Sequence, residues 1–174
     1  MGAHMRCLND QGRLVASLAF LVGLASVAAG LAWQYIGGVM PSELAQQQRL
    51  CHYLGILVLG IVIIFWRRSR LAWQYVAMAV LIAAFLWSAG LSALQAGIEW
   101  GLWPDQAACP NPAGGMWLET LGGIMPIECN VVQLRIFGLS LAGYNALVSL
   151  AIALLLVLAI VMRTRGAASQ PHLQ

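Results

Sequence analysis

The chain has 174 residues, of which 61% are hydrophobic and only 9% are charged. So few polar side chains cannot cover the surface of a water-soluble domain, and the composition therefore predicts an integral membrane protein. The formal net charge of +3 comes from arginines that are not interleaved with aromatic residues in a basic cluster, which argues against a nucleic-acid partner.

Four apolar runs are long enough to cross a hydrocarbon core, which takes about 20 residues per helix. They lie at about Leu14 to Ile36, Leu50 to Trp66, Leu71 to Leu94 and Leu139 to Met162. None of them alternates apolar with polar residues, which excludes a β-barrel and favours helices. We therefore expect an all-α membrane protein with one domain over residues 1–174, folded as a bundle of four transmembrane helices.

The amino-terminal end shows two features that concern processing. Residues 1–4 are typical of a scar left by expression, so we expect native sequence to begin at Met5. The first apolar run is too long for a cleaved signal peptide and has no obvious small-residue cleavage site behind it, so we expect it to remain as a transmembrane helix.

The basic residues indicate how the four spans are oriented, because short loops rich in arginine stay in the cytoplasm. Seven of the nine basic residues flank the spans on one side: Arg6, Arg13, Arg67, Arg68, Arg70, Arg163 and Arg165. This pattern predicts that both termini are cytoplasmic. The two opposite connections, about residues 37–48 and 95–138, would then face the exterior.

Six aromatic residues cluster near the ends of the predicted spans, where amphipathic rings favour the headgroup layer. They are Trp33, Tyr35, Trp66, Trp73, Trp100 and Trp103. We interpret them as interfacial anchors rather than as a cofactor site.

The longer exterior connection is where chemistry is expected. Four prolines and two glycine pairs interrupt any regular structure in it. Between the glycine pairs, residues 116–121 predict a short apolar-faced helical turn that lies in the membrane interface.

Cysteine location decides which thiols can be oxidised. Cys7 would face the reducing cytoplasm and Cys51 would lie just inside the second span, whereas Cys109 and Cys129 share the long exterior loop. One reading is a structural disulfide, which would close a loop of about 20 residues and contribute about 3 kcal/mol in the chain-entropy model. The other is a redox-active pair, and the residues alone do not favour either. No metal site is predicted, because the exterior loops contain no histidine and the two cysteines lack a short spacing.

Three segments of the chain carry a distinctive combination of residues. They are AGIEWGLWP at 96–104 leading to Cys109, ECN at 128–130 followed by FGLSLAGYN at 137–145, and PSELA at 41–45 followed by Gln48 and Arg49. The combination resembles the disulfide bond formation protein B (DsbB) family of membrane quinone reductases across nearly the whole chain.

The resemblance implies a bacterial inner-membrane thiol:disulfide oxidoreductase. In this family the loop pair, here Cys109 and Cys129, exchanges with a periplasmic DsbA-like thioredoxin-fold protein, and the counterpart of Cys109 takes the partner. A second cysteine pair at the head of the second span passes the electrons to ubiquinone or menaquinone. Gln48 and Arg49 would lie at the quinone, where the positive charge of the arginine favours a thiolate and charge developing on the quinone oxygen.

One departure from the family pattern dominates the functional prediction. The family element reads P-C-x-L-C, whereas this chain has Ser42 and Ala45 at the two cysteine positions. Neither side chain can form a disulfide, so quinone-linked turnover is expected to be absent from this exact chain. We favour laboratory replacement of both cysteines, and a natural relative that has abandoned quinone chemistry is the alternative. Gln95, where relatives often have histidine, and Leu134, where many have tryptophan, favour that alternative.

Three functions therefore compete. The chain is a DsbB-type oxidoreductase disabled at positions 42 and 45, or a natural relative that exchanges with or binds a partner through Cys109 and Cys129 only. The third is a non-enzymatic four-helix membrane protein with a structural disulfide. Three residues near the second span also have plain structural readings: Arg49 as a side chain extending to lipid headgroups, His52 as a packed polar residue and Cys51 as a small buried one.

Overall fold

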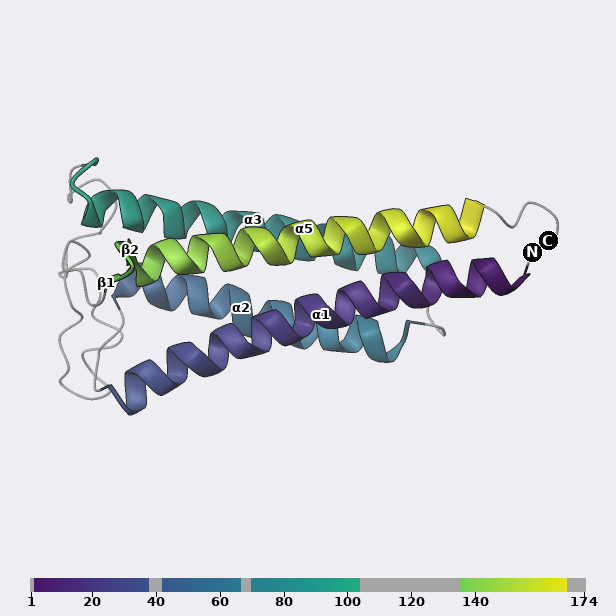
Figure 1. Cartoon of the computed structure of the whole chain (residues 1–174), viewed down its shortest axis with the longest axis horizontal. Coiled ribbons are helices and arrows are strands. Elements are labelled where there is room, and N and C mark those ends of the chain that lie inside the picture. The colour runs from purple at the N-terminus through teal and green to yellow at the C-terminus, as the bar shows by residue number, and fades with distance from the viewer. Residues whose placement is uncertain (1, 38–41, 67–69, 104–134, 169–174) are drawn as a thin grey trace.

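The computed structural model describes the backbone of residues 2–37, 42–66, 70–103 and 135–168. Four long helices make up most of this part of the chain (Figure 1): α1 (Gly2–Tyr35), α2 (Glu43–Ile64), α3 (Leu71–Glu99) and α5 (Leu141–Ala168). A small antiparallel hairpin, β1 (Arg135–Ile136) and β2 (Leu139–Ser140), leads into α5.

Each of the four helices contains a stretch long and apolar enough to cross a membrane. These stretches are Asp10–Tyr35, Leu44–Ile64, Leu71–Glu99 and Leu141–Arg165. The predicted all-α bundle of four membrane-spanning helices is therefore confirmed. The short interfacial helix predicted at residues 116–121 lies outside the described residues.

All four helices extend beyond the spans expected from hydropathy, and the extensions of α2 and α3 contain buried polar residues. The second helix begins at Glu43, ahead of the predicted Leu50, and the third continues to Glu99, past the predicted Leu94. The polar residues Gln48 and Gln95 in these extensions are buried against neighbouring helices. Hydropathy makes both helices too short there, because these polar side chains find partners inside the protein rather than in water.

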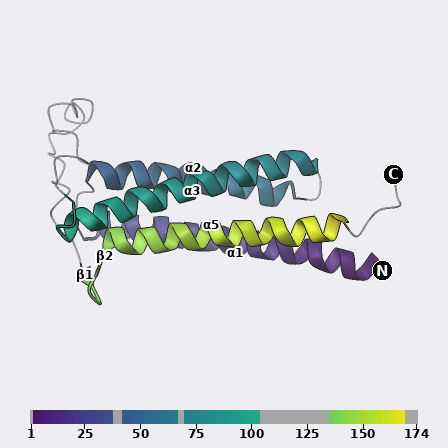
Figure 2. The same cartoon turned by 90° about the horizontal axis from the view of Figure 1, so that it is seen from above.

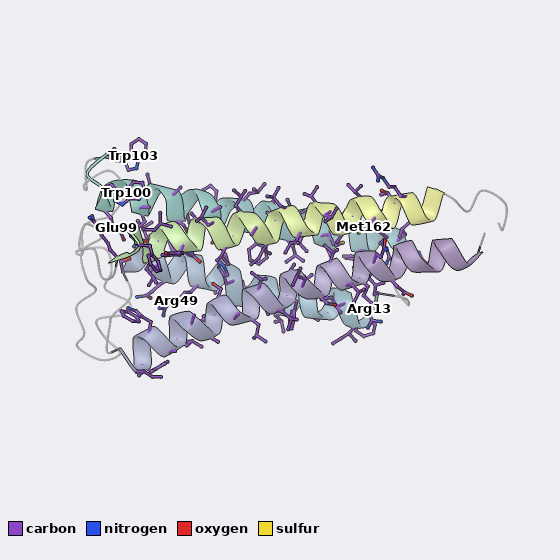
Figure 3. The ribbon with its side chains drawn as sticks, in the orientation of Figure 1. Arg13, Arg49, Glu99, Trp100, Trp103 and Met162 are labelled. Atoms are coloured by element: carbon purple, nitrogen blue, oxygen red, sulfur yellow. The ribbon has the colours of Figure 1, made fainter. Side chains whose placement is uncertain are left out.

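The helices run up and down, so that the start of α1, the end of α2, the start of α3 and the end of α5 lie at one end of the bundle (Figure 1). Arg13, on α1, lies at this end, and so does Met162 next to Arg163 on α5 (Figure 3). We call it the arginine end, and it is the end that the charge pattern predicts to face the cytoplasm. In the main packing contacts, α1 and α3 each lie against both α2 and α5.

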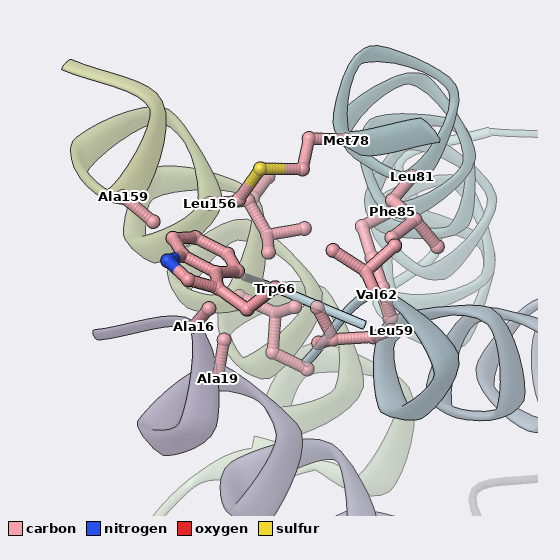
Figure 4. Packing of buried hydrophobic residues seen from close by; sticks show 12 residues of the cluster. Ala16, Ala19, Leu59, Val62, Trp66, Met78, Leu81, Phe85, Leu156 and Ala159 are labelled. Carbon is pink, nitrogen blue, oxygen red and sulfur yellow. The ribbon is translucent and has the colours of Figure 1, made fainter. Parts of the chain in front are cut away.

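A cluster of buried apolar side chains from all four helices fills the bundle toward the arginine end (Figure 4). Its members are Ala16, Ala19, Leu59, Val62, Trp66, Met78, Leu81, Phe85, Ile152, Ala153, Leu156 and Ala159. Large apolar residues such as Leu57 and Trp87 point outward instead and are well exposed. Apolar side chains both inside and on the surface are typical of a bundle surrounded by lipid. In lipid, side-chain packing and hydrogen bonds, rather than the hydrophobic effect, hold the helices together.

Trp66 joins all four helices, and its predicted role as an interfacial anchor is wrong. Its side chain is fully buried, and the guanidinium of Arg163 on α5 lies 4.4 Å from the centroid of a Trp66 ring, in cation–π geometry. The Trp66 carbonyl oxygen accepts hydrogen bonds from Arg163 (3.0 Å) and from Gln74 Nε2 on α3 (2.8 Å). A Cβ at Gly12 on α1 would lie 3.4 Å from the same ring. A backbone carbonyl at the end of α2 therefore receives its hydrogen bonds from neighbouring helices.

We expect Trp66→Ala to lower the free energy of unfolding by about 3–5 kcal/mol, because it empties a site where four helices meet. Trp73→Ala is the matched control, since Trp73 is largely exposed and should change stability far less. Unfolding of the purified protein in detergent, followed by circular dichroism, measures both. Equal losses would contradict the central position of Trp66.

Candidate functional site

The head of α2 is organised by Ser42. Its backbone is extended (φ −66°, ψ 164°) and its Oγ accepts a hydrogen bond from the backbone N–H of Ala45 at 3.3 Å. This is the N-cap geometry that serine favours, and it explains why the helix begins here. The Ser42 side chain is only 2% exposed, so position 42 lies inside the protein at the positive end of a helix dipole.

Three carboxamide side chains connect Ser42 to the interior. Gln95 Nε2 donates to Ser42 Oγ (3.2 Å) and to Glu99 Oε1 (3.3 Å), while its Oε1 accepts from Gln48 Nε2 (3.0 Å). Asn145 Nδ2 then donates to Gln48 Oε1 at 2.8 Å. These bonds link α2, α3 and α5, and the amide group of Gln95 donates directly to the residue at the head of α2.

The hydrogen bonds continue deeper into the bundle through serines. Asn145 Nδ2 also donates to Ser92 Oγ (2.8 Å), and Ser92 Oγ donates to the Ser88 carbonyl (2.8 Å). Ser149 Oγ donates to Ser88 Oγ at 3.3 Å. We call the whole connected set the polar cluster: Ser42, Gln48, His52, Ser88, Ser92, Gln95, Asn145 and Ser149.

His52 forms the inner limit of the polar cluster. Its Nδ1 lies 3.0 Å from the Gln48 carbonyl, and because a carbonyl can only accept, Nδ1 carries the proton. Its Nε2 lies 3.5 Å from Ser149 Oγ, and its ring meets Phe85 edge-on with centroids 5.4 Å apart. His52 is thus a packed polar residue, as predicted.

Arg49 faces the opposite way from the neighbouring Gln48. Its guanidinium donates to the side chain of Gln34 and, at 3.1 Å, to the carbonyl oxygen of Gly30, both on α1. Figure 3 shows Arg49 and Glu99 at the end of the bundle remote from Arg13. The plain reading in which Arg49 extends to lipid headgroups is not what the structure shows, because these bonds hold it against α1.

Two buried polar atoms near this end have no hydrogen-bond partner among the described residues, and neither residue was predicted as part of the site. They are Trp33 Nε1 and Glu99 Oε2. Trp33 shares a face of α1 with Gly30 and Gln34, since residues three and four apart are neighbours on a helix. Buried polar atoms are nearly always paired, so an unpaired indole N–H beside the residues that hold Arg49 fits a ligand that offers an acceptor oxygen.

The sequence contained a signal for one of these two residues. Glu99 follows Gln95 by four positions, the spacing at which helical side chains meet, although the end of the apolar run at Leu94 predicts a loop there. Trp33 carried no such signal, because a tryptophan near a span end is usually an anchor.

The structure brings together only part of the predicted site. Ser42, Ala45 and Gln48 share one end of α2, and Arg49 lies beside them on the α1 side. Cys109 and Cys129 lie outside the described residues. Among the described residues Cys51 is a free thiol, partly buried within α2. In that same part of the chain, no group of three His, Cys, Asp or Glu residues could hold a metal ion.

The arrangement at position 42 is suited to an anion. A side-chain atom there receives a backbone N–H, a carboxamide N–H and the field of a helix N-terminus, all of which favour negative charge. A cysteine at that position would be stabilised as its reactive thiolate. The serine present neither ionises at ordinary pH nor forms a disulfide.

This fold and site define a multi-pass membrane protein in which a buried polar cluster surrounds the head of the second helix. The family model for disulfide bond formation protein DsbB matches residues 12–159, and the chain belongs to that family. The resemblance inferred from the three sequence segments is therefore confirmed, and the class is that of membrane thiol oxidoreductases of disulfide-bond formation. No curated protein and no solved structure matches the chain.

A double-mutant cycle tests the link between α2 and α3. We expect Gln48→Leu and Gln95→Leu each to lower the free energy of unfolding by about 1–3 kcal/mol, because each leaves buried polar atoms unpaired. The double variant should lose less than the sum of the two, by about 0.5–1.5 kcal/mol. Gln47→Leu, at an exposed position of the same helix, is the matched control. Strict additivity would show that the two carboxamides do not interact.

Proposed function

We propose that this chain is a DsbB-type thiol:disulfide oxidoreductase whose quinone-side cysteine pair has been replaced. Its intact chemistry would re-oxidise a periplasmic DsbA-like dithiol protein and pass the electrons to ubiquinone or menaquinone in the bacterial inner membrane. The observation that carries the proposal is the environment of Ser42, which supports a thiolate although no thiol is present. Arginine distribution supports the sidedness, with the head of α2 at the periplasmic face.

The exchange step would take place at Cys109 and Cys129. A thiolate of the partner attacks the disulfide at Cys109, so that one S–S bond forms as another breaks and Cys129 leaves as a thiolate. The second partner thiolate then attacks the mixed disulfide and releases Cys109. The partner ends as a disulfide, and the loop pair ends as two thiols that hold its two electrons and two protons.

In a complete site, a second pair at positions 42 and 45 would re-oxidise the loop pair in the same way. The head of α2 supports this role through the N–H groups of Ala45 and Gln95, which would lower the pKa of a thiol at position 42 outside the apolar core. In this chain Ser42 and Ala45 cannot form that second disulfide, so the electrons would stay on the loop pair.

The residues around Arg49 fit a quinone in their hydrogen-bonding character. Arg49 supplies a permanent positive charge, and Trp33 supplies a buried N–H that has no partner within the described part of the chain. Both are suited to a carbonyl oxygen. When bound, a quinone would supply the final acceptor for two electrons and two protons. Arg49 would orient its carbonyl, and the apolar wall of α1 would keep water away.

One observation favours the second candidate, a natural relative without quinone chemistry. The Ser42 hydroxyl accepts from both Ala45 and Gln95, so serine is fully integrated at this position. Gln95 stands where relatives often have histidine, and a carboxamide is a suitable partner for a hydroxyl. Such a protein would still exchange disulfides through Cys109 and Cys129.

Restoring both cysteines tests the main proposal. Ser42→Cys combined with Ala45→Cys should give quinone reduction driven by a reduced DsbA-like protein. The loss of quinone absorbance measures this reaction. Ser42→Cys alone is the matched control and should remain inactive, because a single thiol cannot form the required disulfide. Adding Cys109→Ser to the restored chain should abolish turnover. A restored chain no more active than the original would reject the proposed enzyme.

Quinone binding can be measured without any thiol chemistry. Trp33→Phe keeps an aromatic ring but removes the N–H, and we expect it to weaken binding of a short-chain ubiquinone about fivefold, the equivalent of one hydrogen bond of about 1 kcal/mol. Trp73→Phe, on the exposed surface, should leave the affinity unchanged. Calorimetry of the detergent-solubilised protein gives both values. If the two variants bind alike, the quinone does not contact Trp33.

A further inference from the structure

The hairpin that leads into α5 contains a residue in an unfavourable conformation. Arg135 pairs with Ser140 and Ile136 with Leu139, which leaves Phe137 and Gly138 as a two-residue turn. Both have positive φ, 51° for Phe137 and 84° for Gly138, as tight hairpin turns require. Asparagine or glycine usually occupies the first of these positions, because a bulky side chain is strained there.

No packing contact among the described residues compensates for this strain. The Phe137 side chain is 100% exposed, the highest value among the described large hydrophobic residues. A strained backbone that presents an unpacked aromatic ring indicates a role outside the fold of the chain itself.

The hairpin is held at the level where two membrane spans end. The Arg135 side chain donates to the backbone oxygen of Glu99, the last residue of the α3 span, at 3.3 Å. Ser140 is buried, and its Oγ accepts from the Gly143 N–H in the first turn of α5 (3.2 Å). The turn therefore lies beside the ends of the spans and not far out in water.

The direction of the hairpin identifies what the ring meets. Figure 2 shows β1 and β2 projecting sideways from the start of α5, away from α2 and α3. A sideways projection at this depth enters the headgroup layer of the surrounding bilayer. Exposed Trp100 and Trp103 lie at the same end of the bundle (Figure 3), as expected for a level occupied by interfacial aromatic residues.

We propose that Phe137 is a membrane-interface anchor, with its ring inserted at the boundary between lipid headgroups and acyl chains. The tight turn holds the ring outward, and Arg135 next to it suits the phosphate layer. The anchor would hold the hairpin, and with it the start of α5, at the bilayer surface. The proposal does not depend on quinone binding or on disulfide exchange.

A fluorine label tests the location of the ring. The full chain, with 4-trifluoromethylphenylalanine at position 137, is placed in phosphatidylcholine nanodiscs. Its 19F NMR signal is recorded with each of two paramagnetic quenchers in turn. We expect broadening at least threefold greater from lipid carrying a nitroxide near the top of the acyl chain than from a water-soluble gadolinium chelate. The same label at Leu57 should respond to the lipid quencher only, and at buried Phe85 to neither. Stronger broadening by gadolinium, or protection from both quenchers, would overturn the anchor.

Amide hydrogen exchange then distinguishes the effect of the anchoring ring from the backbone preference of the residue at position 137. Asparagine suits the backbone of position 137 better than phenylalanine, so Phe137→Asn should make the hairpin more protected if the ring has no role. If the ring anchors the hairpin, exchange at residues 135–140 in nanodiscs should rise at least threefold in Phe137→Asn and stay near the original rate in Phe137→Trp. Equal or slower exchange in Phe137→Asn would overturn the proposal.

Discussion

The hydrogen bond between Gln48 and Gln95 joins α2 to α3 in a part of the bundle where water offers no substitute partner. A carboxamide inside a membrane protein is tolerated only when its donors and acceptors are paired, so each member of the polar cluster fixes its neighbour. Gln95 donates to Ser42 while its oxygen accepts from Gln48, and Gln48 in turn accepts from Asn145. The geometry at the head of α2 therefore depends on three helices together.

The two ends of the bundle are stabilised in different ways. At the arginine end, the buried Trp66 ring packs against apolar side chains and the guanidinium of Arg163. The Trp66 carbonyl, at the end of α2, accepts its hydrogen bond from Arg163 on α5. At the other end, packing gives way to side-chain hydrogen bonds and to the attachment of Arg49 to α1. The chemical groups of the candidate site thus lie where the bundle is polar, and the apolar cluster beyond His52 supplies a rigid base for them.

Much of the architecture could be predicted from the sequence, because apolar runs and arginine-rich ends follow simple physical rules. The four spans were predicted in this way, whereas the family was identified from the residues of three segments. The roles given to Gln48 and Arg49 stay predictions. Hydropathy could not show that Gln48 and Gln95 are helical and buried, since it does not register partners from other helices. It also misplaced Trp66, because only the fold brings Arg163 and Gln74 to its carbonyl. The roles of Cys109 and Cys129 stay predictions.

The chemical type of residue 95 has a consequence for how the head of α2 responds to its surroundings. An imidazole at that position would change its charge within the physiological pH range, and its influence on position 42 would change with it. A carboxamide neither gains nor loses a proton under those conditions. The partial positive charge that Gln95 directs at Ser42 is therefore constant whatever the acidity of the medium. In this chain, that part of the local field is permanent and does not act as a sensor.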